Sequence, residues 1–192
     1  MSAAGEATTI AQFGVRAPSR RARQRVERAR HGDRDALEEL YLEHFDRIFS
    51  YLHLNVGNRY DAEDLTMKTF IRMIESIGRF EWRDVPVSAW LFRIAHNALT
   101  DWQRTRFRLQ LQEEPPEPPA HTQPTADEEA LAALSRKSML GMIERLPRDQ
   151  KQVLTLKFVF DFSNGEAASI LGKTEGAVKS LQHRALTTLR AA

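Results

Sequence analysis

The sequence predicts an all-α protein of two small helical domains joined by an acidic, proline-rich linker. Apolar residues recur at helical spacing through residues 33–108 and again through 130–190. The stretch between them, 109–129, contains five prolines and six carboxylates but no Lys or Arg, so it cannot pack a core. The predicted units are a disordered, basic N-terminal extension (1–30), a first domain (31–108), the linker (109–128) and a second domain (129–192).

Composition excludes several classes of protein. The 192 residues include no cysteine, which rules out disulfides and cysteine-ligated zinc or iron–sulfur sites. No apolar run approaches the roughly 20 residues that span a bilayer, and the N-terminus lacks the apolar stretch of a signal peptide. We therefore expect a cytoplasmic protein without membrane insertion, and we expect no cofactor and no metal.

Charge is distributed in blocks, although the net charge is only +2. Residues 1–32 hold seven Arg against two Glu, whereas 109–129 are purely acidic. Such alternation indicates separate surfaces for nucleic acid and for other partners. Within the N-terminal block, 1–19 are expected to be disordered. Residues 20–30 are expected to be a solvated charged segment, with a basic helix touching the DNA backbone as the alternative.

Two helices are predicted to open the first domain. Asp33 is a typical N-cap for a helix reaching about Leu54, after which Gly57 and Asn58 break it. Its inward stripe is Leu37, Leu40, Tyr41, His44, Phe45, Ile48 and Leu52, with His44 read as a packed core histidine. A second helix, 61–77, turns Ala62, Leu65, Phe70, Met73 and Ile77 inward and Asp61, Asp64, Lys68, Ile71, Arg72 and Glu75 outward. That outer face fits a protein-docking surface or a plain solvated helix.

The loop 79–86 combines aromatic and cationic residues. Phe80 and Trp82 lie among Arg79 and Arg83, a composition that suits unstacked bases, unless one or both aromatics cap the core. A long helix should follow from Pro86 to about Phe107. Its apolar stripe is Val87, Trp90, Leu91, Ile94, Ala98 and Trp102, and its opposite face carries Arg93, His96, Asn97, Thr100, Arg104 and Phe107. Loop and helix together form a candidate single-strand-binding surface.

The second domain is predicted to end in a helix-turn-helix. After an apolar helix from Asp127 and another from Pro147, two helices of about 164–171 and 175–190 flank a turn at Gly172. In the last helix Val178, Leu181, Ala185 and Leu189 share one face, while Lys179, Ser180, His183, Arg184 and Thr187 share the other. A face of donors and cations suits phosphates and base edges, although an ordinary amphipathic helix is the alternative.

Three stretches together resemble one family. DAEDLTMKTF, PVSAWLFRIAHNALTDWQRTR and LPRDQKQVLTLKFVFDFSNGEAASILGKTEGAVKSLQHRAL resemble the extracytoplasmic-function (ECF) group of bacterial sigma-70 factors, over about residues 33–190. The resemblance implies a promoter-selecting protein in which 31–108 is sigma region two and 129–192 is sigma region four. It also implies binding to the largest subunits of RNA polymerase core, to duplex and melted promoter DNA, and to an anti-sigma factor.

The expected roles of individual residues follow from the resemblance together with the faces above. Polymerase binding is assigned to Asp61, Asp64, Lys68, Ile71 and Arg72. DNA binding is assigned to Arg79, Trp82, Arg83, Arg93, Asn97 and Arg104 in the first domain and to Lys173, Thr174, Lys179, Ser180, His183 and Arg184 in the second.

Three other classes of function would each require features of their own. A stand-alone helix-turn-helix regulator would need a dimerisation helix, and none is evident. An enzyme would need a phosphate loop or a nucleophile with its base, and none is evident either, so no catalytic residue is expected. A pure interaction protein would use only the acidic face of 33–78.

Overall fold

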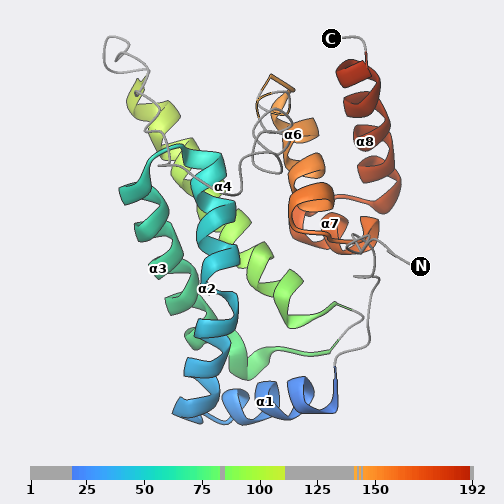
Figure 1. The fold of residues 1–192 in the computed structure, drawn as a ribbon. Coiled ribbons are helices and arrows are strands. Elements are labelled where there is room, and N and C mark those ends of the chain that lie inside the picture. The colour runs from blue at the N-terminus through green and yellow to red at the C-terminus, as the bar shows by residue number, and fades with distance from the viewer. Residues whose placement is uncertain (1–18, 83–84, 111–140, 142, 144, 191–192) are drawn as a thin grey trace, which may run out of the picture.

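The structure is a computed structural model that describes residues 19–82, 85–110, 141, 143 and 145–190. Its elements are α1 (Arg20–Arg30), α2 (Arg34–Val56), α3 (Arg59–Ser76), the 3-10 turn η1 (Ile77–Arg79), α4 (Val87–Gln110), α6 (Arg148–Leu154), the π-helical turn η2 (Thr155–Val159), α7 (Asn164–Leu171) and α8 (Glu175–Arg190). All regular structure in these ranges is helical, which confirms the predicted all-α class. One group of helices contains α1 to α4, and α6 to α8 form a second group beside α4 (Figure 1).

Helix α1 differs from the solvated segment expected for residues 20–30. Ser19 caps its first turn by accepting a hydrogen bond from the Ala22 amide at 3.1 Å. Val26 and Ala29 are buried on the side that faces α2 and η1. The expectation was wrong because charged residues dominate this sequence. Two apolar residues three positions apart, Val26 and Ala29, are nevertheless enough to pack one face of the helix against its neighbours.

The boundaries of α2 and α3 follow from their caps. The Asp33 side chain accepts from the Ala36 amide at 3.1 Å, and a hydrogen bond from Arg28 keeps the pKa of that carboxyl below its usual value. Gly57 ends α2 with a left-handed φ of 69°, and Asn58 then caps α3. The predicted inward residues of α3 are all buried. His44 is buried as expected, and that burial, with Arg47 and Arg25 nearby, lowers its pKa to about 4.

Helix α4 is buried on two faces rather than one. The predicted stripe faces α2 and α3, but Phe92, Ala95 and Leu99 are also fully buried, in the core that α4 shares with α7. His96, expected on the exposed face, is half-buried, with Nδ1 3.0 Å from the Tyr51 hydroxyl. Burial, with Arg148 and Lys173 nearby, lowers the pKa of His96 to about 4. The second buried face explains why the first half of this helix, 87–99, is mostly apolar.

The two groups of helices share one continuous core. The ring of Phe92 lies 5.1 Å from that of Phe160 and 4.7 Å from that of Phe162, measured between centroids. Arg47 of α2 donates a hydrogen bond to the carbonyl oxygen of Phe160. The aromatic turn after η2 therefore inserts between α2 and α4, and it joins the N-terminal and C-terminal groups.

Several predictions concern residues outside the described ranges. They are the disorder of 1–18, the role of Arg83, most of the linker, and the apolar helix that begins at Asp127. Over the part of the chain that the structure does describe, no helix is both long and apolar enough to cross a membrane.

Candidate nucleic-acid interface

The helix-turn-helix is formed by α7 and α8 at the boundaries expected. Ser163 and Glu166 build a reciprocal capping box at the start of α7. Gly172 ends that helix with φ 62°, a left-handed conformation that costs glycine little. Thr174 then caps the next turn by accepting from the Ala177 amide at 3.2 Å. This local chemistry sets the angle at which α8 leaves the turn.

Helix α8 separates an inner face from an outer one. Val178 and Ala185 are fully buried, and Leu181 and Leu189 are partly buried. The predicted DNA-binding residues of its outer face are all exposed: Lys179, Ser180, His183 and Arg184. Lys173 is less free, because its ammonium lies 2.9 Å from the Asp149 carboxylate of α6.

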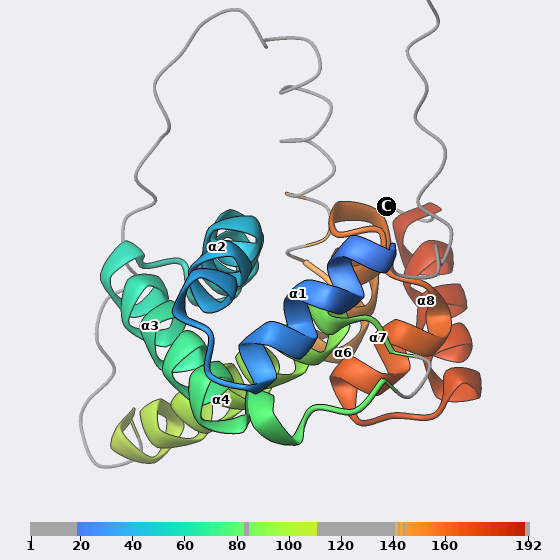
Figure 2. The same ribbon diagram turned by 90° about the horizontal axis from the view of Figure 1, so that it is seen from below.

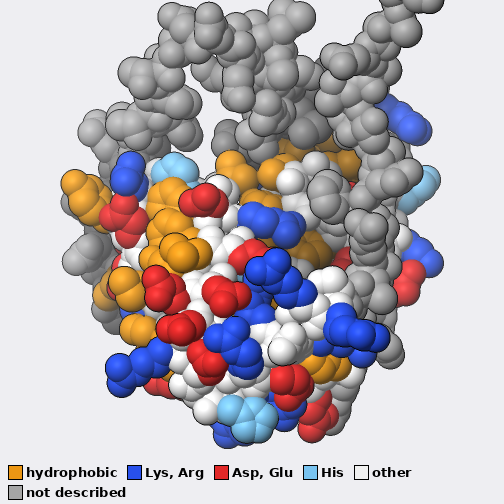
Figure 3. Space-filling view, turned by 60° about the horizontal axis from the view of Figure 1, so that its bottom comes forward, with side chains coloured by type: hydrophobic (Ala, Val, Ile, Leu, Met, Phe, Trp, Pro, Cys, Tyr) orange, Lys and Arg blue, Asp and Glu red, His pale blue; other side chains and the backbone are white. Residues whose placement is uncertain are grey.

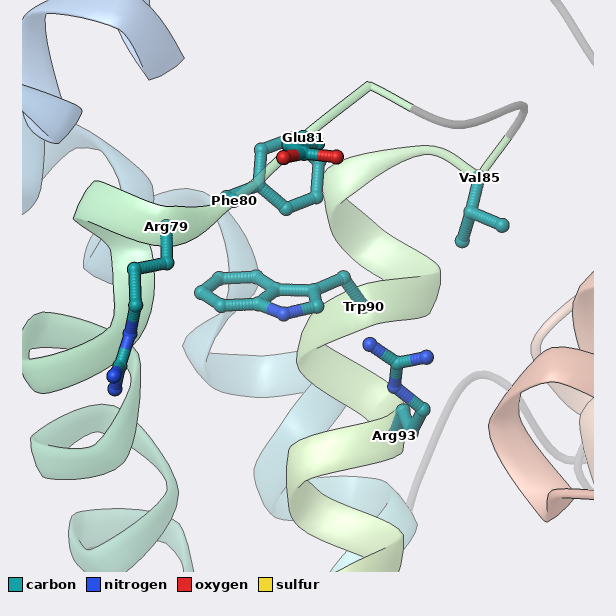
Figure 4. Close-up of a pocket in the computed structure, with 6 residues that line it drawn as sticks. All are labelled: Arg79, Phe80, Glu81, Val85, Trp90 and Arg93. Atoms are coloured by element: carbon teal, nitrogen blue, oxygen red, sulfur yellow. The ribbon is translucent and has the colours of Figure 1, made fainter.

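A pocket of about 270 Å³ opens between the loop after α3 and the first turns of α4. Its lining residues are Arg79, Phe80, Glu81, Val85, Trp90 and Arg93. Figure 4 shows the Phe80 and Trp90 rings adjacent, with Arg79 on one side and Arg93 on the other. The ring centroids of Phe80 and Trp90 are 5.0 Å apart. The pocket thus combines the edges of two aromatic rings with two guanidinium groups and one carboxylate, that of Glu81. Aromatic and cationic groups together are typical of surfaces that hold a base and its phosphate.

Trp82 does not line this pocket, although the sequence favoured it for base contact. Its ring packs edge-on against Phe80 at 5.2 Å, and the Arg23 guanidinium of α1 lies 5.7 Å from its centroid. Trp90 lines the pocket instead. Helical periodicity assigned Trp90 to the core, and it is only 9% exposed, but one edge reaches the pocket. A residue that serves both the core and a site gives no separate sequence signal.

The remaining predicted residues of α4 are exposed along one side of the helix. Arg93 lies at the pocket, and Asn97 follows one turn later. Arg104 belongs to a second hollow of about 510 Å³, which is lined by Val56, Trp102, Gln103, Arg104, Arg106, Phe107 and Arg148. Arg106 and Arg148 were not assigned a role from the sequence. With Arg104 they bring three guanidinium groups to this hollow, of which Arg104 and Arg106 lie near the carboxylates of Asp101 and Asp61.

The outer face of α3 carries the residues predicted to bind a protein. Asp64 and Lys68 pair at 2.6 Å, and Asp61 lies 3.6 Å from Arg106. Ile71 is 48% exposed, and Arg72 is exposed beside it. The sequence analysis missed three further exposed apolar side chains: Leu42 of α2 and Met67 and Ile74 of α3. Figure 3 shows hydrophobic side chains gathered among charged ones over α2 and α3.

Comparison with known proteins covers both groups of helices. A family model described as sigma-70 region 2 matches residues 40–108, and one described as sigma-70, region 4 matches residues 136–189. The chain is 36% identical over 172 residues to the ECF RNA polymerase sigma factor BldN of Streptomyces coelicolor. That alignment covers 89% of this chain and 65% of BldN, just under two thirds of its length.

A second relative is matched over nearly its whole length. The RNA polymerase sigma factor CarQ of Myxococcus xanthus is 32% identical over 169 residues, which are 86% of this chain and 93% of CarQ. Two solved structures share the fold. CnrH, solved with the cytosolic domain of CnrY, has a TM-score of 0.64 at 24% identity, covering 88% of this chain and 95% of its own. RpoE of Bartonella quintana, solved with the anti-sigma factor NepR, has a TM-score of 0.67 at 22% identity, covering 80% and 94%.

Proposed function

The chain belongs to the ECF group of the sigma-70 family of bacterial RNA polymerase sigma factors, and from this membership we propose how its surfaces divide the work of transcription initiation. The outer face of α8 reads the duplex of the minus-thirty-five element. The pocket between the loop and α4 receives a base from the melted minus-ten element. The outer face of α3 docks on the largest subunits of the polymerase core. The protein acts in the cytoplasm by binding, and the polymerase performs the chemistry.

The pocket is the observation that carries this proposal. Taking a base out of a duplex costs a few kcal/mol, and a preformed receptor lowers that cost only for a base that fits it. Phe80 and Trp90 supply apolar ring edges against which the base can pack, and Arg79 and Arg93 supply cations for the neighbouring phosphates. Arg93 at the pocket and Asn97 one turn later are both exposed, which gives a displaced strand a route along α4.

The two DNA-binding surfaces also require the helical groups to separate. The minus-ten and minus-thirty-five elements are about 25 base pairs apart, and at 3.4 Å per base pair this is roughly 85 Å. In the structure α4 and α7 are in direct contact, so this form cannot reach both elements. The 20 residues predicted as linker, 109–128, have a maximum extended length of about 70 Å, so the chain between the groups can cover most of that separation.

This geometry favours a mechanism in which the protein binds promoter DNA tightly only when it is assembled with core polymerase. Free protein in the compact form would bind promoter DNA weakly. Core polymerase, by holding the two halves apart at a fixed distance, would let each act at high effective concentration once the other is bound. Because CnrH and RpoE were solved with CnrY and with the anti-sigma factor NepR, we also propose an anti-sigma partner for this chain.

Abortive transcription with purified core polymerase tests the proposal. Core plus this protein should make short transcripts on fragmented genomic DNA that core alone does not make. The Arg93→Ala variant should bind core normally but open the same promoters less, as measured by permanganate reactivity of unpaired thymines. Absence of any new transcript would contradict the proposal. A gel shift of equal strength without core polymerase would instead support a stand-alone helix-turn-helix regulator.

A further inference from the structure

Helix α1 divides its arginines into two sets. Arg25 pairs with Glu39 and Glu43 of α2, and Arg28 pairs with Asp33 at 2.7 Å and Glu39 at 3.6 Å. Within the described ranges, no carboxylate pairs with Arg20, Arg21 or Arg23, and all three side chains are exposed. The first set anchors the helix, so the second set is held in place without being neutralised.

One unpaired arginine faces the loop that forms the pocket. The Arg23 guanidinium lies 5.7 Å from the Trp82 ring, Trp82 lies 5.2 Å from Phe80, and Phe80 lies 5.0 Å from Trp90. These contacts form an unbroken cationic and aromatic track from α1 into the pocket. Figures 1 and 2 both place α1 beside this loop, in views at right angles.

The helical repeat separates the unpaired arginines further. At 3.6 residues per turn, Arg20 and Arg23 lie about 60° apart around the helix, whereas Arg21 lies about 160° from Arg23. Arg21 therefore falls on the flank nearer Arg25 and the acidic residues of α2. Position, and not charge alone, distinguishes Arg20 and Arg23 from Arg21.

We propose that Arg20 and Arg23 bind backbone phosphates of the melted promoter strand where it passes the pocket, which makes α1 a second cationic wall of the single-strand interface. Charge complementarity and continuity with the pocket both point to single-stranded DNA. Aromatic rings interleaved with arginines are typical of surfaces that hold a single strand without reading its sequence. The inference rests on the promoter-opening function proposed above, and it extends that function to a segment with no assigned role.

The test compares the doubly substituted Arg20→Ala/Arg23→Ala protein with Arg21→Ala, each as the full chain bound to core polymerase. Fluorescence anisotropy would measure affinity for a pre-melted promoter fork as a function of salt. Since each single-strand phosphate contact contributes about 0.7 to the slope of log affinity against log salt, the double variant should lose about 1.4 from that slope. Its affinity should fall about 5- to 20-fold at 0.1 M salt, from two lost contacts. Arg21→Ala should match the wild type.

Several outcomes would overturn the inference. One is an unchanged salt slope in the double variant, which would show that Arg20 and Arg23 contact no phosphate. Another is an equal loss in Arg21→Ala, which would reduce α1 to a diffuse positive charge. A loss of affinity for core polymerase in place of DNA would show that these arginines bind an acidic protein surface. Arg23→Lys should keep the salt slope, because it keeps the charge. Failure of the wild-type holoenzyme to open any promoter would count against the proposed function itself, a distinguishable result.

Discussion

Arg47 donates a hydrogen bond from Nη2 to the carbonyl oxygen of Phe160, at 2.7 Å and 113 positions further along the chain. The same guanidinium lies 5.6 Å from the centre of the Phe92 ring and 5.4 Å from that of Phe162. One cation on α2 thereby contacts three groups that belong to both halves of the molecule. This contact is a direct means of testing how the compact form is held.

Replacing Arg47 with alanine should loosen the compact form. A hydrogen bond from a charged donor contributes about 1.5–3 kcal/mol, so the free energy of unfolding should fall by about that amount in urea titrations. Small-angle scattering should also show a larger radius of gyration. Arg59→Ala is the matched control, because the Arg59–Glu63 pair is exposed and worth about 1 kcal/mol or less. Equal behaviour of the two variants would show that Arg47 does not hold the halves together.

Gly172 should be the least replaceable glycine of the helix-turn-helix. Its φ of 62° is strained for any residue with a Cβ, although a Cβ there would meet no atom within 4 Å. Gly172→Ala should therefore cost about 1 kcal/mol of conformational energy alone. Gly176→Ala, inside α8 and equally unobstructed, should stabilise the protein by about 0.5–1 kcal/mol, because alanine is the better helix former. Thermal unfolding of both variants checks the opposite signs.

Arg184 should carry recognition of the upstream duplex. It is exposed on the outer face of α8, and if it reads a guanine, Arg184→Ala should weaken promoter binding by about 1–3 kcal/mol in a footprint titration of the holoenzyme. Arg190→Ala removes the same charge from the last turn and should have a smaller effect, one that is uniform across promoter sequences. Unchanged affinity in Arg184→Ala would refute the assigned role.

The apolar surface on α3 predicts an effect on assembly with core polymerase. Ile71→Asp should weaken core binding at least about tenfold, equivalent to roughly 1.4 kcal/mol, because it places a charge within a desolvated contact. Leu109→Asp is the control, since Leu109 is also exposed but lies at the end of α4. Competition for core against a labelled sigma factor measures both. Equal losses would mean that α3 is not the docking face.

His44 predicts acid sensitivity of the fold. Its pKa of about 4 in the folded protein lies below the value of roughly 6.5 in the unfolded chain. Between these two pH values the unfolded chain binds a proton at His44 and the folded chain does not. Stability is therefore complete above pH 6.5 and is lost as the pH falls toward 4, with about 2 kcal/mol gone at pH 5. Urea titrations at pH 8 and pH 5 would measure this loss together with a similar one from His96, whose pKa is also lowered to about 4, and His44→Leu should remove the His44 share. His183→Leu, at an exposed site, should not.

Much of the fold follows from the sequence because its signals are local. Asp33, Gly57 and Gly172 mark helix ends by their own side chains or backbone preference, and the structure places the ends there. The burial of Tyr51, Phe92 and Phe160 against one another could not be predicted in this way. Each lies on its own helix or turn. Only the tertiary arrangement of these elements decides which face of α4, in addition to its predicted apolar stripe, is buried.

The candidate nucleic-acid interface divides in the same way, into features that local sequence signals predict and features that depend on tertiary packing. Exposure of Lys179, His183 and Arg184 was predictable, because a helical repeat with two buried positions fixes the opposite face. The sequence did not predict that Trp90 lines the pocket and Trp82 does not, because both lie near one loop and only packing decides which ring reaches the pocket. That choice depends on α1, whose Arg23 covers Trp82, and the sequence did not predict that α1 packs there.

The aromatic contact between the halves bears on how the protein can be produced in pieces. A fragment ending after α4 would present Phe92 to solvent, and a fragment beginning at α6 would present Phe160 and Phe162. Exposed hydrophobic patches of this kind promote self-association. Separately expressed fragments should therefore precipitate or dimerise, unless polar residues replace these rings.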